Sequence, residues 1–232
     1  MAIRALALAL LGWLGCAWSL RLSMSTTDIK ARTTIKIASE TDFPLVARFL
    51  SEAMYGPDVP NGQRKELARL ELIDLRDRYG STVGKRKFPA ALIVAEEDEE
   101  VVGCVGLDCQ LFDQKGRKFS KLKPGVVVDS NGMSDRGEVA VVLSNLAVRV
   151  DKRGQGVASQ LIGVCEDFAG QWQREAVYLL VDSENAGAQK LYKKQGYREQ
   201  YRDQATCVVS GGVSLKTQDC VNLCMKKPLG GG

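Results

Sequence analysis

One stretch of the chain, Leu143–Ala158, constrains the fold more than any other. An apolar run up to Val148 predicts a strand, a charged turn follows, and Gly154 and Gly156 precede a segment with helical spacing of apolar residues. A strand that leads through a glycine-containing loop into a helix presents backbone N–H groups at the helix N-terminus, where anions bind. Because glycine has no Cβ, a phosphate can come close to such a backbone. The stretch therefore predicts a strand and a helix joined by a pyrophosphate-binding loop.

Two common phosphate-binding patterns are absent from this loop. A dinucleotide-binding loop needs a third glycine where, counted from Gly154, Ser159 stands. A Walker loop needs a Gly-Lys-Ser/Thr sequence, which does not occur around these glycines. What remains is the pattern Arg153-x-x-Gly156-x-Ala158, in which Arg153 adds a positive charge beside the loop. Taken alone, this short pattern also fits a plain turn followed by a helix.

A second segment narrows the choice. The apolar run Ala176–Val181 predicts a buried strand, Asn185 after it is a good helix N-cap, and Gly196 is placed to end that helix. This segment resembles the pattern V-x-x-x-N-x-x-A-x-x-L-Y-x-K-x-G-F/Y, and Arg153–Ala158 resembles R/Q-x-x-G-x-G/A. The two patterns, in this order, are signatures of the GCN5-related N-acetyltransferase (GNAT) family. The resemblance is close over residues 138–203 and elsewhere concerns only the order of elements.

The resemblance implies the GNAT acyl-CoA N-acyltransferase fold, an α/β fold with a mixed, mostly antiparallel sheet of about seven strands flanked by about four helices. Residues 35–228 are expected to form this single domain. The expected elements are a strand at 34–38, a helix from 41–44 to 55, a helix at 61–79 with Leu67, Leu70 and Ile73 as its apolar residues, strands at 90–95 and 101–109, a long loop at 111–137, a strand at 138–148, a helix at 154–172, a strand at 176–181, a helix from 185 to 196, and strands at 197–201 and 221–225.

The resemblance also implies acetyl-CoA as the co-substrate. In the family, the strand before the loop splays away from its neighbour, and its free backbone groups hold the pantetheine arm. The residues expected to contact acetyl-CoA are Leu146, Ala147 and Val148 on this strand, Arg153, Gly154, Gln155, Gly156, Val157 and Ala158 in the loop, and Asn185, Ala188 and Tyr192 on the next helix. A plain buried strand would account equally well for the three apolar residues, and a helix cap for Asn185.

Acetyl transfer from a thioester needs a neutral amine, a polarised carbonyl and a proton for the leaving thiolate. When both substrates are held together, positioning supplies much of the effect and no covalent intermediate is needed. Tyr192 lies two helical turns after Asn185, and its phenol suits protonation of the thiolate, although it also suits a core position. The chain has no histidine, so a carboxylate acting through water is the usual base. Glu138 is the leading candidate, with Asp182 and Ser144 behind it, and solvent is an alternative.

Three functions remain open at the level of sequence. The first is acetylation of protein N-terminal amines or lysine side chains, as in plastid-type members of the family. The second is acetylation of a small amine or polyamine, with the loop at 111–137 closing a pocket. The third is a non-catalytic acyl-CoA-binding regulator, which the intact loop, Asn185 and Tyr192 disfavour. A net charge of +4 with 26% charged residues predicts no nucleic-acid partner.

The N-terminal residues predict a targeting leader at residues 1–34. Arg4 precedes the apolar run Ala5–Leu14, which is typical of a signal peptide over about residues 1–19 and is too short to span a membrane. Residues 20–34 are rich in Ser, Thr and basic residues, as in a transit peptide. Together these segments predict delivery to the plastid stroma, with no stable membrane insertion after the leader is removed. A signal alone would mean secretion or an endomembrane lumen.

Cysteine usage favours the reducing stroma. Cys104, Cys109 and Cys165 lie among apolar residues, where free thiols act as small core residues. Cys220 and Cys224 are interpreted as structural. The chain contains no C-x-x-C pair and no histidine, so we expect no zinc or other metal site. It also contains no N-x-S/T glycosylation site.

Overall fold

The computed structural model describes residues 33–56, 59–80, 88–122, 126, 133–211 and 214–230. The chain divides into two units, Met1–Ala31 and Arg32–Gly232, and the described residues all belong to the second. The predicted signal peptide and most of the transit-like segment lie outside the described residues. In the described part of the chain, no helix is both long and apolar enough to cross a membrane.

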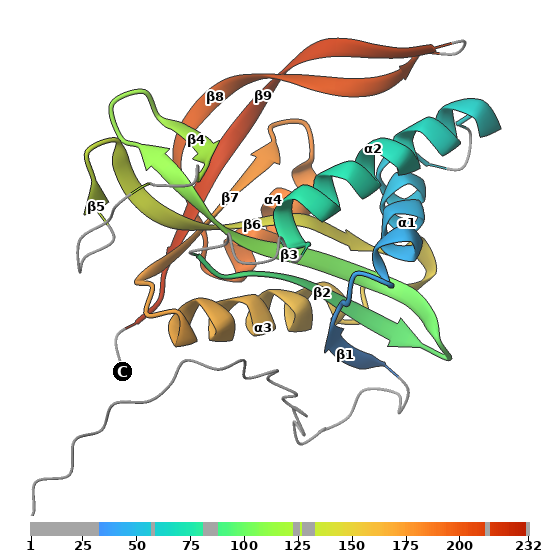
Figure 1. The fold of residues 1–232 in the computed structure, drawn as a ribbon, viewed down its shortest axis with the longest axis horizontal. Helices are drawn as coiled ribbons and strands as arrows, with labels where there is room; N and C mark the ends of the chain where they lie inside the picture. Colours follow the sequence, from blue (N-terminus) through green and yellow to red (C-terminus); the bar gives the residue numbers. More distant parts are fainter. Residues whose placement is uncertain are drawn as a thin grey trace, which may run out of the picture. The chain divides into compact units, whose positions relative to one another are not determined.

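The described residues form one nine-stranded sheet (Figure 1). Seven strands follow the order β1-β2-β3-β6-β7-β9-β8, β4 pairs with β3, and β5 pairs with β6. Neighbouring strands are antiparallel, except that β6 and β7 run parallel. This confirms the predicted mixed, mostly antiparallel sheet. The strands are β1 (Thr34–Ile37), β2 (Ala90–Glu97), β3 (Glu100–Asp113), β4 (Lys118–Lys121), β5 (Met133–Ser134), β6 (Gly137–Val148), β7 (Ala176–Asp182), β8 (Arg198–Gly211) and β9 (Ser214–Pro228).

Helices cover both faces of the sheet. They are α1 (Phe43–Tyr55), α2 (Asn61–Tyr79), α3 (Val157–Gln171) and α4 (Ala186–Lys194), with a short 3-10 helix at Val150–Lys152. Alternation along the strands separates two cores, because successive side chains point to opposite faces. On β2, Ile93 packs in the core that contains the α3 residues, whereas Leu92 and Val94 pack with α1 and α2.

The region predicted as a loop at 111–137 is partly strand. β3 continues to Asp113, and β4 and β5 follow it. β4 has the sequence Lys-Phe-Ser-Lys, and its charged ends hide the strand pattern from a search for apolar runs. Its one aromatic residue, Phe119, stacks on Phe112 of β3 with ring centroids 4.7 Å apart. That contact secures a strand that the sequence pattern does not reveal.

Two further expectations were wrong. β8 and β9 are much longer than the predicted strands at 197–201 and 221–225. Among the described strands, no third one pairs with their added parts, which form a two-stranded ribbon. Polar and apolar residues are mixed along this part of the sequence, so no apolar alternation marks it. On α2, Leu67 and Leu75 are buried, but Leu70 and Ile73 are 40% and 53% exposed. The helix therefore contacts the rest of the fold through a narrower stripe than its apolar spacing suggests.

Candidate active site

β6 and β7 separate in the middle of the sheet. Their pairing joins only Val141–Leu143 to Val177–Leu179. Beyond this point β6 follows β3 as far as Val148, while β7 follows β9 as far as Asp182. A wedge therefore opens between the two strands after Leu143, and backbone groups of β6 that would meet β7 in a continuous sheet have no strand partner. Leu146, Ala147 and Val148 lie along this open part of β6.

A β-bulge marks the start of the wedge. The register between β3 and β6 shifts between Cys104 and Gly106, and Asn145 opposite this shift has φ 55°. Asparagine is one of the few residues that adopt positive φ readily. Its Nδ2 atom is buried and has no hydrogen-bond partner among the described residues. A buried donor without an acceptor is costly unless a ligand supplies one, so Asn145 joins the candidate site although the sequence had given it no role.

The predicted pyrophosphate loop follows β6 directly. Gly154 has φ 75°, and Gly156, the N-cap residue of α3, has φ 89°. A Cβ built on Gly154 would meet nothing within 4 Å, so backbone conformation rather than space favours glycine there. No side chain of a described residue caps α3. The N–H groups of its first turn, beginning with Val157 and Ala158, are therefore left for an external anion.

Two side chains brace this loop. Arg153 Nε donates a hydrogen bond to the Val148 carbonyl at 3.1 Å, and Gln155 Nε2 donates to the Asp151 carbonyl at 2.9 Å. The Arg153 side chain is exposed, and its terminal nitrogens make no hydrogen bond to a described residue. This arrangement fixes the base of the guanidinium and leaves its outer edge for a phosphate.

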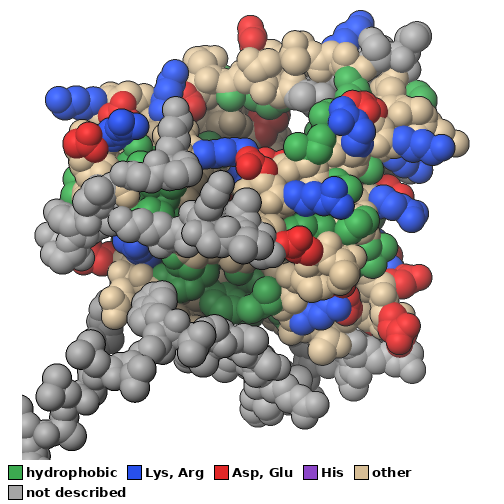
Figure 2. All heavy atoms as spheres, viewed as in Figure 1, with side chains coloured by type: hydrophobic (Ala, Val, Ile, Leu, Met, Phe, Trp, Pro, Cys, Tyr) green, Lys and Arg blue, Asp and Glu red, His purple; other side chains and the backbone are tan. Residues whose placement is uncertain are grey.

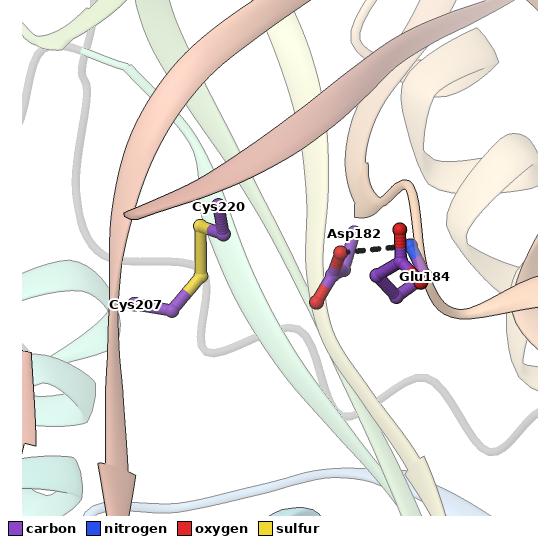
Figure 3. The surroundings of a disulfide bond; sticks show 4 residues. All are labelled: Asp182, Glu184, Cys207 and Cys220. Atoms are coloured by element: carbon purple, nitrogen blue, oxygen red, sulfur yellow. Dashed lines mark hydrogen bonds between the residues drawn. A yellow bond between two sulfur atoms is a disulfide. The ribbon is translucent and has the colours of Figure 1, made fainter. Parts of the chain in front are cut away.

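On the other side of the wedge, a tight turn joins β7 to α4. Asn185 is the N-cap residue of α4, as predicted, and its Oδ1 accepts a hydrogen bond from the Ala188 N–H at 3.0 Å. Asp182, a candidate base, accepts the Glu184 N–H at 2.9 Å (Figure 3). The carboxylate of Asp182 therefore already has a structural task in the turn.

Tyr192 packs at the inner side of α4. It is 6% exposed, and its ring meets the Tyr197 ring edge-on at 5.8 Å between centroids. Burial, with a smaller contribution from Cys165, raises the pKa of the Tyr192 phenol well above its usual value. The phenol therefore keeps its proton at neutral pH, as a proton donor must. No hydrogen bond joins its hydroxyl to a described residue.

Glu138 lies at the other end of β6 from the wedge. It pairs with Phe112 and Met133, and its carboxylate accepts a hydrogen bond from Gln114 Nε2 at 3.4 Å. Ser144, at the opening of the wedge, is six residues further along, or roughly 20 Å at the rise of a strand. The structure does not bring Glu138 together with the open part of β6.

Ser144 lies at the wedge within a polar cluster. Its Oγ is 2.9 Å from the Tyr79 hydroxyl and 3.4 Å from Arg78 Nη1, both at the C-terminal end of α2. Arg78 also pairs with Asp74 at 2.8 Å and with Asp108 at 3.5 Å. Asp108 is a β3 residue that is only 8% exposed. These partners come from distant parts of the chain, so no local pattern connects them in the sequence.

Comparison with known proteins identifies the family. Residues 63–197 match the model of the acetyltransferase (GNAT) family. The chain belongs to this family. The predicted fold class is thereby confirmed. The family match and the named relative support the predicted enzyme class, an acetyl-CoA-dependent N-acetyltransferase.

Individual relatives agree with this assignment. A segment of 56 residues is 46% identical to "GCN5-related N-acetyltransferase 4, chloroplastic" of Arabidopsis thaliana, covering 24% of this chain and 19% of that protein. A probable acetyltransferase from Staphylococcus epidermidis superposes with a TM-score of 0.56 at 15% identity, over 85% of this chain and 99% of that one. The putative acetyltransferase yncA from Salmonella typhimurium, solved with acetyl-CoA, gives a TM-score of 0.50 at 16% identity, over 87% and 96%. At these identities the two structures establish the fold.

Proposed function

We propose that this enzyme transfers acetyl from acetyl-CoA directly to an amine of a polypeptide, either an N-terminal α-amine or a lysine side chain. The observation that carries the proposal is the open wedge between β6 and β7. Leu180, on the diverging part of β7, is 39% exposed. Leu180 is two residues after Tyr178 on the strand, so both side chains point to the same face of the sheet, the one opposite to α3. A wedge that leaves an apolar side chain exposed on this face suits the entry of one end of an acceptor polypeptide.

The loop before α3 would hold the pyrophosphate of acetyl-CoA. The N–H groups of Val157 and Ala158 and the helix dipole favour a negative charge there, and Arg153 adds a cation beside it. Gly154 and Gly156 keep the approach to the backbone open. Gln155 holds the loop in shape through its bond to the Asp151 carbonyl.

The pantetheine arm would run along the open part of β6. Leu146, Ala147 and Val148 offer backbone groups on the side from which β7 has departed. Asn185 lies at the opposite rim, at the start of α4, where its Oδ1 is used by Ala188 and its Nδ2 makes no hydrogen bond to a described residue. We propose this amide and the Ala188 region as the contacts from that rim.

Tyr192 is proposed as the acid that gives its proton to the departing thiolate of coenzyme A. The acceptor amine has to reach the thioester unprotonated. Glu138 is remote from the wedge, Asp182 is held in a turn, and Ser144 Oγ already accepts a hydrogen bond from Arg78. Solvent is therefore the proposed route for the amine proton. Direct transfer needs no nucleophile from the protein, since positioning of the two substrates supplies much of the rate.

We further propose that the enzyme works in the plastid stroma. The signal-like and transit-like segments of the sequence support this, and so does the word "chloroplastic" in the name of the Arabidopsis thaliana relative. On the face shown in Figure 2, basic and acidic side chains are interspersed rather than gathered by sign. That distribution agrees with a protein acceptor better than with a nucleic acid.

A panel of acceptors tests the proposed function. Purified residues 35–232 would be incubated with acetyl-CoA and peptides bearing either a free α-amine or a lysine with a blocked N-terminus, with polyamines and free amino acids in parallel. We expect peptide acetylation with kcat/KM at least tenfold above that of any small amine. Turnover confined to small amines would overturn the protein acceptor while leaving the enzyme class intact.

A further inference from the structure

The Ser144 hydroxyl is held from one side by two residues of α2. Tyr79 and Arg78 are the last residues of a helix that reaches across β3 to the bulge of β6. Arg78 is itself anchored by Asp74 and by the buried Asp108. A guanidinium fixed by two carboxylates has one orientation, so the position of Ser144 is fixed as well.

The neighbouring strand makes room for this contact. Ser144 pairs with Gly106 across β3 and β6. A Cβ built on Gly106 would collide with the hydroxyl and ring of Tyr79. The phenol therefore lies directly over the backbone of β3, and only glycine at this position permits that. The fold contains a cradle whose effect is to bring the Tyr79 hydroxyl to Ser144.

The Ser144 hydroxyl has one unused hydrogen-bonding capacity, its own O–H. A guanidinium only donates, so Arg78 Nη1 donates to Ser144 Oγ. Burial, followed by the charge of Asp108, raises the pKa of the Tyr79 phenol, which therefore keeps its proton. Among the described residues, Ser144 Oγ is the only hydrogen-bond partner of this phenol. Tyr79 thus donates as well, both lone pairs of the serine oxygen are used, and the serine O–H remains to be donated.

Strand alternation shows where that O–H points. On β6, Val141 and Leu143 pack in the core that contains α3, whereas Val142 packs on the opposite face. Ser144 shares the face of Val142, as its contacts with α2 confirm. The pyrophosphate loop begins α3 on the other face. A molecule that meets Ser144 therefore approaches the wedge from the side away from α3, as the acceptor does.

We infer that Ser144 binds the acceptor by donating its O–H to the carbonyl oxygen of the acceptor's first residue. This inference rests on the proposed function and narrows the acceptor to N-terminal α-amines of polypeptides. Such an amine has a carbonyl next to its α-carbon, whereas the amine of lysine or of a polyamine is surrounded by methylene groups. With those acceptors the serine O–H would stay unpaired, which is costly in a partly buried site.

The test combines an enzyme change with a substrate change. One substrate is a peptide with a free α-amine, and the other is the same peptide with its first amide replaced by an alkene, which keeps the shape but removes the carbonyl. Because the replacement alters the pKa of the amine, kcat/KM is expressed per neutral amine. For the wild type we expect about a tenfold loss on the alkene peptide, the effect of one hydrogen bond.

The variants extend the same comparison. Ser144→Ala should lose about tenfold on the normal peptide and then treat the two peptides alike, while Ser144→Thr should keep the discrimination. Tyr79→Phe and Gly106→Ala should each weaken the discrimination, since they act on the position of Ser144. Tyr55→Phe, at the end of α1, is the matched control and should behave as the wild type. The Kd for acetyl-CoA should be unchanged in all of them.

The outcomes separate this inference from the function on which it rests. If Ser144→Ala slows both peptides equally, or still discriminates between them, Ser144 does not bind the carbonyl, although the protein acceptor stands. Acetylation of lysine peptides without acetylation of α-amines would likewise contradict the role of Ser144 and leave the protein acceptor standing. If only polyamines are acetylated, the proposed function itself fails. A folding defect in a variant would alter both substrates alike and would not imitate loss of discrimination.

Discussion

Tyr192 and Asn185 show how single residues serve both fold and chemistry. Asn185 caps α4 through its Oδ1, which sets the helix in place, and Tyr192 two turns later is packed against Tyr197. The same burial that stabilises the helix raises the pKa of the Tyr192 phenol. A proton donor for a thiolate must remain protonated until the thiolate forms, and burial supplies this property without a further residue.

Replacing Tyr192 by phenylalanine tests its role as an acid. Because general acid catalysis contributes about 10²–10⁴-fold, we expect kcat to fall by a factor in this range, with little change in acetyl-CoA affinity. Since the folded pKa is raised, wild-type kcat should show no loss from ionisation of this phenol up to about pH 10. Single-turnover kinetics would measure the chemical step. A chemical rate within about twofold of wild type would make Tyr192 a packing residue.

Single residues were predictable where the local backbone conformation dictates the residue type. Gly154, Gly156 and the capping Asn185 were identifiable because each position needs a particular backbone state or cap. The contact between Tyr79 and Ser144 was not, because the two residues are 65 positions apart and meet only when α2 crosses the sheet. The choice of Glu138 relied on residue type in a strand, and only the register shows that it lies away from the wedge.

At the level of elements, the β8–β9 hairpin extends beyond the sheet. β7 pairs with β9 only as far as Asn222, so among the described strands none lies beside the residues nearer the hairpin tip. Cys207 and Cys220 form a disulfide across this part, with Cα atoms 6.1 Å apart (Figure 3). The pairing of Cys220 with Cys207 was not predicted. Because disulfides are rare in reducing compartments, this bond does not support the cysteine-based preference for the stroma, and the plastid proposal rests on the leader segments. Cys104, Cys109 and Cys165 are buried free thiols, as expected.

Because a two-stranded ribbon is marginally stable in water, we expect the disulfide to hold the outer hairpin. A disulfide between residues 13 positions apart stabilises the folded state by about 3 kcal/mol relative to the unfolded chain. In a Cys207→Ala/Cys220→Ala variant, amide hydrogen exchange should accelerate in residues 203–211 of β8 and residues 214–222 of β9. Exchange in α3 should stay unchanged. Dithiothreitol should reproduce this in the wild type and add nothing in the variant. Equal protection in oxidised and reduced protein would show that the ribbon holds without the bond.

Elements with strong periodicity or caps were predictable, and the hairpin was not. α2 was predicted at its observed bounds, Asn61–Tyr79, because Pro60 and Gly80 flank a continuous segment without a helix-breaking proline. The outer ribbon mixes polar and apolar residues without alternation and takes its strand character from cross-strand pairing, which a single segment does not display. For the same reason β4 and β5 were assigned to a loop.

For the whole molecule, the order of elements identified the fold, while the wedge came only from the structure. Two signatures separated by one helix and one strand are enough to specify a GNAT fold. The wedge, however, is a place where pairing stops, at Leu143 and Leu179. The apolar residues on either side of that point look the same in sequence, so no pattern distinguishes a splayed strand from a paired one.

The destination of the whole chain is the remaining prediction. A fluorescent protein fused behind residues 1–35 should accumulate in plastids, because the apolar run Ala5–Leu14 directs entry into the endomembrane system and the acid-poor segment at 20–34 directs onward import. Deleting residues 20–34 from the fusion is the matched control and should divert it to the secretory pathway. Replacing Ala5–Leu14 with polar residues should keep it in the cytosol. Accumulation of the full fusion in the medium, or its retention in the endoplasmic reticulum, would contradict a plastid location and make the leader a plain signal peptide.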